Sequence, residues 1–297
     1  MLINHKIPYR YILNTIKYQL TYVLVFSILV YFLSEVYDET LPYIPLAIPA
    51  FIGTAISILL SFKLNQSYDR WWEARKIWGS IVNDSRNLVL QLQALTTNGD
   101  PTIIKKMGHR QIAWTYAFSK SLRGKDPMPE VSKWLDDAEI AELGDHNNKA
   151  LALLQFHGRD LAKLRESGQL DSFGQVQINS TISRLCDSMG MAERIKNTVF
   201  PITYRLYLMM IIYLFIALLS ISLREMQLYF QLPLSLLISS IFLLLEKTST
   251  SLQDPFEDRP SDVPLNAISR TIEINLKQLL KEKEVPGPFP SYGFYLD

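Results

Sequence analysis

The stretch that decides the fold covers residues 41–79, LPYIPLAIPAFIGTAISILLSFKLNQSYDRWWEARKIWG. Its first part is apolar enough to cross a bilayer, and its second part turns polar and aromatic. The second part contains no glycine or proline before Gly79. One unbroken helix is therefore predicted to leave the membrane and continue into a water-soluble body. Such a helix, placed at a symmetry axis, would form the wall of a pore.

The composition favours a mixture of membrane helices and a sizeable soluble part. The chain has 297 residues, of which 48% are hydrophobic and 20% are charged. This is too apolar for an ordinary soluble domain and too charged for a protein made only of membrane spans. The net charge of +1 gives no field that would favour nucleic acid as a partner. The single cysteine, Cys186, excludes an internal disulfide framework and a multi-cysteine metal site.

Four apolar segments approach the ~20 residues that a helix needs to cross the hydrocarbon. They cover about residues 18–36, 43–64, 206–223 and 228–245. We predict an all-α membrane protein with four transmembrane helices and a cytoplasmic helical body, assembled around a central pore. The expected divisions are 1–17 (N-terminal segment), 18–64 (first hairpin), 65–205 (helical region), 206–245 (second hairpin) and 246–297 (connector, helix and arm).

The distribution of positive charge predicts the orientation in a cell membrane. The loop after the first span contains acids and no lysine or arginine, and the loop after the third span contains only Arg224 beside Glu225. The N-terminal flank, the region after Asn65, the approach to the third span and the tail after Lys247 are all basic. Both termini and the long central segment are therefore expected in the cytoplasm.

The segments outside the spans show a helical pattern and almost no strand signal. In the central region, apolar residues recur at helix spacing around residues 78–92, 112–122, 148–164 and 173–191. Residues 265–280 form an amphipathic pattern typical of one helix. The last stretch, VPGPFPSYGFYLD, contains too much proline and glycine for regular structure, and we expect it to be an arm that lies on a neighbouring copy.

The sequence offers no catalytic constellation, so we do not expect an enzyme. It contains no glycine-rich phosphate loop, no His-Glu-x-x-His and no Gly-x-Ser-x-Gly. The four histidines have no ligand spacing between them; they are His5, His109, His146 and His157. No cofactor or catalytic residue is predicted.

The second span carries a stripe that has two interpretations. Thr54, Ile58 and Phe62 follow one another at i, i+4 and i+8, so they lie along one helix face. For an arbitrary span, such a face most often packs on another helix. The other sides carry small residues that allow close helix packing, namely Gly53, Ala55, Ser57 and Ser61. The stripe could therefore ring a conduit if several copies met, and a hydrophobic ring can gate by dewetting.

Polar and aromatic residues follow the stripe where the helix enters the cytoplasm. An ion leaving the membrane would first meet four polar side chains, those of Asn65, Gln66, Asp69 and Arg70. The pair Trp71 and Trp72 comes next. The two tryptophans are either interfacial anchors or part of a joint that couples the soluble body to the pore.

Three separate blocks resemble the bestrophin family, in particular its bacterial branch. They are SYDRWWEARKIWGSIVNDSRNL, ERIKNTVFPITYRLYL and DPFEDRPSDVPLNAISRTIEINL, at residues 67–88, 193–208 and 254–276. The blocks lie far apart and in the order of the family, and the match covers nearly the full length. The resemblance implies an ion channel built as a ring of five identical chains around one pore, in a lipid bilayer, passing monovalent ions.

The resemblance also implies the site residues. The narrow neck of the family corresponds here to Thr54, Ile58 and Phe62, and Thr54 stands where relatives usually carry a bulky apolar group. A second, cytoplasmic constriction corresponds to Phe200, before Pro201. A ring of phenylalanine there would be tighter than the isoleucine or valine expected.

Calcium and selectivity follow less directly from the resemblance. Animal members bind calcium near an acidic run that here supplies Glu257, Asp258 and Asp262. Arg259 puts a positive charge among these acids and Pro260 breaks the loop, whereas calcium takes six or more oxygen ligands, so calcium is doubtful. Chloride is the expected ion as the family default, and a cation-conducting homologue is the alternative.

Two other classes of membrane protein remain as alternatives. A secondary transporter usually carries internal repeats and ionisable residues near the bilayer midplane. These spans have none deep within them; Lys63 and Arg205 lie near the cytoplasmic ends. A membrane-anchored scaffold would not need the Thr54–Ile58–Phe62 face.

Overall fold

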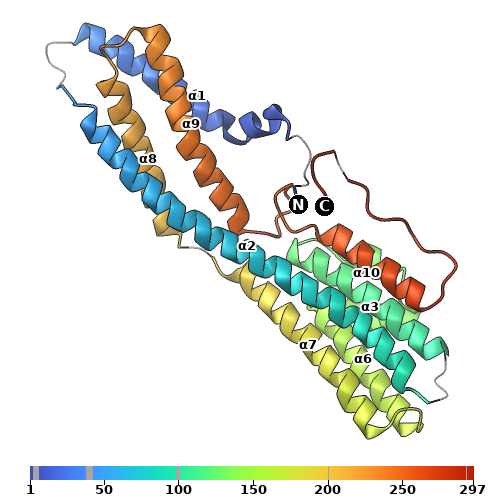
Figure 1. The fold of residues 1–297 in the computed structure, drawn as a ribbon. Helices are drawn as coiled ribbons and strands as arrows, with labels where there is room; N and C mark the ends of the chain where they lie inside the picture. Colours follow the sequence, from blue (N-terminus) through green and yellow to red (C-terminus); the bar gives the residue numbers. More distant parts are fainter. Residues whose placement is uncertain (3–6, 38–42, 98–100, 200, 292) are drawn as a thin grey trace. The chain divides into compact units, whose positions relative to one another are not determined.

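The computed structural model describes residues 1–2, 7–37, 43–97, 101–199, 201–291 and 293–297. Within these residues the chain is helical, with one isolated bridge between Leu2 and Tyr295 as its β contact. The helices are α1 (Tyr9–Val36), α2 (Ala47–Leu95), α3 (Pro101–Leu122), α4 (Met128–Val131), α5 (Asp137–Gly144), α6 (Lys149–Glu166), α7 (Ser172–Asn197), α8 (Ile202–Ser222), α9 (Leu228–Gln253) and α10 (Leu265–Leu279) (Figure 1).

The helices form two compact units. The membrane unit contains α1, α8, α9 and α2 as far as Arg70. The helical body contains the rest of α2 from Trp71, helices α3 to α7, and residues 254–297. The long helix α2 belongs to both units, and it runs through the boundary without a break. The predicted continuous helix is therefore confirmed.

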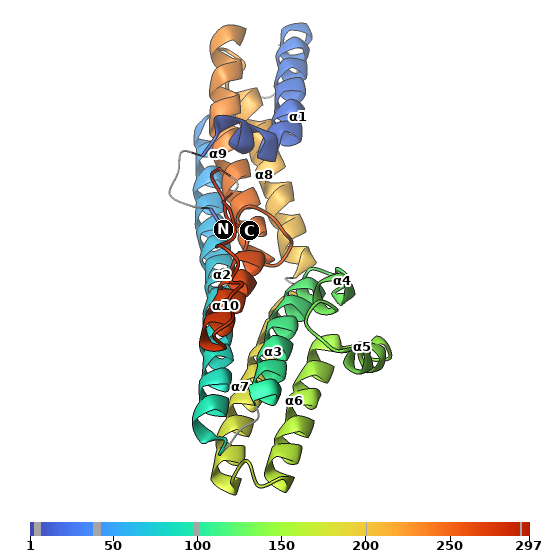
Figure 2. The same cartoon turned by 90° about the vertical axis from the view of Figure 1, so that its right-hand side faces the viewer.

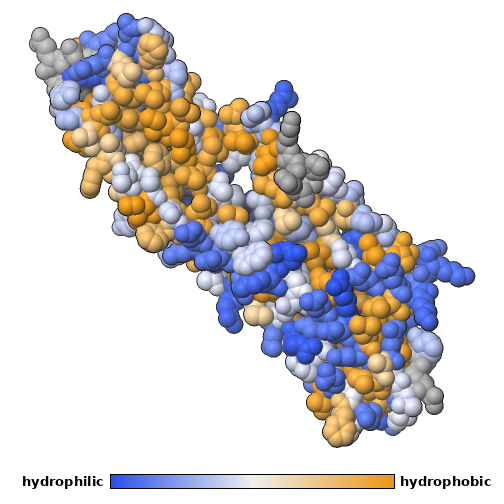
Figure 3. Space-filling model, viewed as in Figure 1, coloured by the Kyte–Doolittle hydropathy of each residue, from blue (hydrophilic) through white to orange (hydrophobic). Residues whose placement is uncertain are grey.

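The membrane unit confirms the predicted fold class. Four helices in the described residues, α1, α2, α8 and α9, are long and apolar enough to span a bilayer. Their shared core is aliphatic and aromatic, built around residues such as Ile56, Leu60, Ile212 and Phe215. Figure 3 shows the outer face of this unit as mostly hydrophobic, which suits contact with lipid or with other copies.

The helices of the membrane unit extend beyond the apolar windows in the sequence. Helix α1 begins at Tyr9, and α9 continues to Gln253. Hydropathy marks the part of a helix that suits the hydrocarbon, whereas the backbone hydrogen bonds continue into the polar flanks. This difference brings polar residues beyond residue 245 into α9, and several of them form hydrogen bonds with α2.

The helical body packs α3, α6, α7 and α10 with the second part of α2 around an apolar core (Figure 2). An aromatic stack lies at its centre, with Phe118 between Trp78 and Trp114 at ring-centroid distances of 5.6 and 5.5 Å. Helix α5 is capped by Asp136, whose carboxylate accepts a hydrogen bond from the Glu139 amide at 2.8 Å.

The end of the C-terminal arm bonds to its own helical body. The amide of Ala267 donates to the Asp297 carbonyl at 2.8 Å, and the Asn266 side chain donates to the Asp297 carboxylate at 2.7 Å. We expected this arm to lie on a neighbouring copy, whereas its last residue is anchored at the start of α10.

Candidate functional site

Helix α2 has two different faces within the membrane unit. One face is buried against the other helices, and it includes Ile56 and Leu60 at 0% and 2% exposure. On the other face Ile58 is 54% exposed and Phe62 is 61% exposed, and Thr54 is exposed as well. The three residues of the predicted stripe therefore share a face that no described part of the chain's own membrane unit covers.

The exposed side of α2 also carries small residues. The Thr54 hydroxyl donates to the Ala50 carbonyl at 3.0 Å, and the Ser57 hydroxyl donates to the Gly53 carbonyl at 2.8 Å. These hydroxyls are thus satisfied within the helix. Ala55, Ser57 and Ser61 are exposed, whereas Gly53 is buried against Phe215. Small exposed residues at a helix surface allow another helix to approach closely.

The same face continues as a polar surface toward the end of the membrane unit. Asn65 and Asp69 follow Ile58 and Phe62 at helical spacing, and both are exposed, as is Gln66. Arg70 is half-buried, and its Nε donates to the Gln253 carbonyl at 2.6 Å. An apolar stripe therefore passes into a polar one that carries an exposed carboxylate.

The two adjacent tryptophans differ in their surroundings. Trp71 is half-buried against the core of the helical body, and its indole N–H donates to the Ser261 carbonyl at 3.1 Å. Trp72 is 47% exposed, and its ring is stacked with that of Trp71 at a centroid distance of 6.4 Å. The hydrogen bond fixes Trp71 to the loop before α10, and both residues belong to the helical body.

A polar ladder between α2 and α9 was not predicted from the sequence. The Lys63 ammonium lies 3.1 Å from the Glu246 carboxylate and 3.1 Å from the Thr250 hydroxyl. The hydroxyls of Ser67 and Ser249 are 3.1 Å apart one turn further along. No periodic signal pointed to it, because every residue from Glu246 to Gln253 except Leu252 is polar, so the sequence does not single out one helix face there.

Phe200, the predicted second constriction, lies outside the described residues. The acids considered for calcium are described, and two of them are paired with cations. Glu257 is paired with Lys196, and this hydrogen bond lowers the pKa of Glu257. Asp258 contacts Lys125, and it lies 3.0 Å from Arg123. Burial raises the pKa of Asp258, but the two cations outweigh burial and leave that pKa lowered.

Asp262 caps the loop in which these acids lie. Its carboxylate accepts hydrogen bonds from the amides of Glu257 at 2.7 Å and Arg259 at 3.1 Å. Burial raises the pKa of Asp262, and the bonds from the loop only partly oppose this effect. Among the described residues, no group of three or more His, Cys, Asp or Glu side chains could hold a metal ion. This arrangement does not fit a calcium site, which needs six or more free oxygen ligands.

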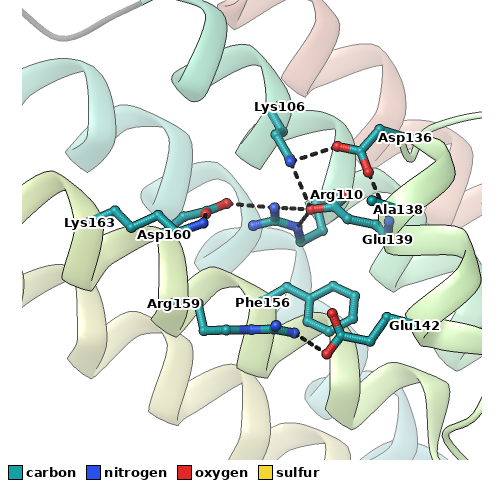
Figure 4. Close-up of a pocket in the computed structure, with 10 residues that line it drawn as sticks. All are labelled: Lys106, Arg110, Asp136, Ala138, Glu139, Glu142, Phe156, Arg159, Asp160 and Lys163. Carbon is teal, nitrogen blue, oxygen red and sulfur yellow. Dashed lines mark hydrogen bonds and ion pairs between the residues drawn. The ribbon is translucent and has the colours of Figure 1, made fainter.

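The helical body also contains a charged pocket of about 180 Å³ (Figure 4). Arg110, at its base, lies 2.6 Å from the Asp160 carboxylate and donates from Nε to Glu139 at 3.1 Å. Lys106 lies 2.7 Å from Asp136 and 3.2 Å from Glu139. The charges that line the pocket pair with one another, so their arrangement holds α5 against α3 and α6.

The sequence of the chain places it in a known family. The profile of the Bacterial/Fungal Bestrophin protein family matches residues 7–278. The chain belongs to the bestrophin family. This bestrophin is 33% identical over 278 residues to the voltage-dependent anion channel-forming protein YneE of Escherichia coli K12, covering 93% of the chain and 90% of that protein. The protein of the same name from Salmonella typhi is 32% identical to the chain over 237 residues, covering 80% of the chain and 77% of that protein.

The fold of this bestrophin is similar to that of a solved bacterial homologue. The crystal structure of a bestrophin homologue from Klebsiella pneumoniae matches it with a TM-score of 0.85 and 28% identity, over 91% of the chain and 100% of that structure. The predicted family is therefore confirmed. The relatives are channel-forming proteins, and this confirms that the chain is not an enzyme.

Proposed function

We propose that this bestrophin forms a homopentameric channel that conducts small monovalent anions, chloride first, across the cell membrane. Both termini and the helical body lie in the cytoplasm in this proposal. Support for anions comes from the names of the curated relatives, which are voltage-dependent anion channel-forming proteins. The ring of five rests on the family resemblance, and the orientation rests on the distribution of positive charge.

One observation carries the proposal: the exposed face of α2. Lipid-facing surfaces are usually bulky and apolar, and α8 has such a surface, with Leu206, Tyr207 and Met210 at 56%, 63% and 58% exposure. The exposed side of α2 instead mixes Phe51, Ile58 and Phe62 with the hydroxyl-bearing and small residues described above. Further along α2 the same exposed face becomes polar, with Asn65, Gln66 and Asp69. Such a surface suits a conduit lined by several copies better than it suits lipid.

The proposed neck is formed by Thr54, Ile58 and Phe62, one ring from each residue. Rings of apolar side chains control conduction through dewetting and through their width. A ring of Thr54 makes that level wetter than a bulky apolar residue would. Phe200 remains the proposed second constriction on the resemblance alone. Asp69 and its polar neighbours form the proposed passage below the neck.

Recording from the purified protein in planar bilayers tests this proposal. Reversal potentials in asymmetric sodium chloride give the sign of the permeant ion. Phe62→Ala is expected to raise the single-channel conductance, because it removes a phenyl ring from the proposed neck without disturbing buried contacts. Phe200→Ala is expected to do the same. Leu237→Ala is the matched control, since Leu237 is 62% exposed on α9 and lies away from the proposed conduit.

Each competing function predicts a different result in the bilayer recordings. Unchanged conductance in both phenylalanine variants contradicts the assigned constrictions. Saturable flux without discrete steps indicates a transporter, and electrical silence under all conditions indicates a scaffold. A reversal potential near that of sodium identifies the cation-conducting alternative, which the exposed carboxylate of Asp69 favours.

A further inference from the structure

A buried ion pair connects the proposed pore-lining helix to α9. Lys63 is 1% exposed and Glu246 is 5% exposed, and their charged groups are 3.1 Å apart. Thr250 completes a triangle, because its hydroxyl lies 3.1 Å from the Lys63 ammonium and 2.9 Å from the Glu246 carboxylate. Ionisable groups buried at the edge of a membrane are costly unless paired, so each member of this triangle is fixed by the others.

The triangle is one step of a longer ladder. Ser67 meets Ser249 at 3.1 Å, and Arg70 donates to the Gln253 carbonyl at 2.6 Å. These contacts follow the two helices to the end of the membrane unit, where the chain continues at Trp71 and at Asp254 into the helical body. The ladder therefore joins two of the segments through which the chain passes from one unit to the other.

The ladder lies on the side of α2 opposite the proposed neck. At 100° per residue, Lys63 is about 140° around the helix from Ile58. Apolar contacts between membrane helices are weakly directional, because lipid tails are as apolar as the side chains they replace. A buried ion pair with a fixed hydroxyl partner is directional, and buried ionic groups can specify one arrangement among several.

We infer that the Lys63–Glu246 pair, completed by Thr250, fixes the rotation of α2 about its own axis and so holds Phe62 and Ile58 toward the conduit. This inference rests on the proposed function only for its effect on conduction. Ser61 precedes Phe62 by one position, so a partial rotation of α2 exchanges a phenyl ring for a hydroxyl at the level of the neck. The pair consists of positioning residues, since neither side chain lies on the exposed face.

The test compares Glu246→Gln with the wild-type protein, and it uses two readouts. The first readout is single-channel conductance, which is expected to change by about twofold or more when the neck ring is no longer held. The second is the rate at which N-ethylmaleimide modifies a cysteine placed at position 58 or 56 in a Cys186→Ser background. With Glu246 present in that background, Ile58→Cys should react about tenfold faster than Ile56→Cys, because Ile58 is 54% exposed and Ile56 is 0% exposed.

Glu246→Gln should reduce this rate ratio to about threefold or less, at an unchanged oligomer mass. Thr250→Val keeps both charges and the side-chain shape, so it should narrow the ratio by a smaller amount. The double variant Lys63→Glu with Glu246→Lys should restore both the ratio and the conductance. Glu73→Gln is the control on the same helix, because it breaks the exposed pair with Lys76, at 2.5 Å, and should change neither readout.

The two readouts separate this inference from the proposed function. If Glu246→Gln assembles and keeps both the wild-type ratio and the wild-type conductance, the inference is overturned. If the wild-type protein carries no current but Glu246→Gln still loses the cysteine contrast, the pair positions α2 and the channel proposal fails. If the charge swap fails to assemble, Thr250→Val decides, since an unchanged ratio in that variant contradicts the inference.

Discussion

Replacing His157 should flatten the dependence of the protein's stability on pH. His157 lies on α6 and is 0% exposed in the core of the helical body. Neither ring nitrogen has a hydrogen-bond partner among the described residues. Burial lowers the pKa of His157 well below its usual value, and the nearby charge of Arg110 lowers it further. The imidazole is therefore neutral in the folded protein at pH 7.

The sign and size of the effect follow from proton linkage. Histidine in an unfolded chain has a pKa of about 6.5, so below that pH the unfolded state binds a proton that the folded state does not accept. Each further pH unit then costs about 1.4 kcal/mol of unfolding free energy. If His157 stays neutral at pH 5, the loss between pH 8 and pH 5 is about 2 kcal/mol. In a unit of 150–250 residues this lowers the unfolding midpoint by roughly 4–8 °C.

The assay is thermal unfolding of the purified protein in detergent from pH 8 to pH 5. Tryptophan fluorescence is a suitable signal, because Trp78 and Trp114 lie fully buried in the same core. His157→Leu has no titrating ring at that position, so its midpoint should fall by roughly 4–8 °C less than that of the wild-type protein. His146→Leu is the control, since it also replaces a histidine by leucine, at a position of the helical body that is only half-buried.

Parallel pH curves for the wild-type protein and His157→Leu would contradict this prediction, because they would mean that His157 binds protons equally in the folded and unfolded states. A fall in His146→Leu as small as in His157→Leu would also contradict it. Carboxylates titrate over part of this range in every variant, so the difference between the curves, and not the slope of any one of them, isolates the buried ring.

Three further outcomes follow from the packing and the charges. Gly53→Val should lower the unfolding midpoint by the equivalent of about 1–3 kcal/mol, because an added Cβ would lie 3.2 Å from the Phe215 ring; exposed Ala55→Val serves as the control. Arg110→Met should cost about 3–5 kcal/mol in the same assay, whereas Lys106→Met, at 41% side-chain exposure, should cost about 1 kcal/mol or less. Calcium and a chelator should give the same midpoint and the same currents in the wild-type protein, and a rise in either with calcium would show that the acidic loop holds a metal after all.

The sequence was sufficient for the features that depend on neighbouring residues. The four spans follow from apolar windows, and the continuity of α2 past the apolar window follows from the absence of glycine and proline between its apolar part and Gly79. The amphipathic segment at 265–280 appears as α10, Leu265–Leu279. Each of these signals is local, and neither long-range contacts nor a partner chain can easily override it.

The contacts between distant residues could not be predicted in the same way. Lys63 lies near the end of its apolar segment, where a lysine commonly extends toward water, but the structure buries it against Glu246, 183 positions away. The cations that neutralise Glu257 and Asp258 come from α7 and from the residues immediately after α3. Helical periodicity shows which residues of α2 share a face, but only the fold shows which face the other helices cover.

The division of α2 into two faces also bears on how this bestrophin selects ions. The proposed neck of Thr54, Ile58 and Phe62 carries no formal charge, so in this proposal it discriminates by width and by the cost of removing water from the ion. Preference for one sign must then come from charged groups below the neck. There, Asp69 is exposed on the proposed lining face, whereas the Arg70 guanidinium is half-buried and donates to a backbone carbonyl. The two measurements in the bilayer are therefore expected to report on different residues: conductance on Phe62, and the sign of the reversal potential on the groups around Asp69.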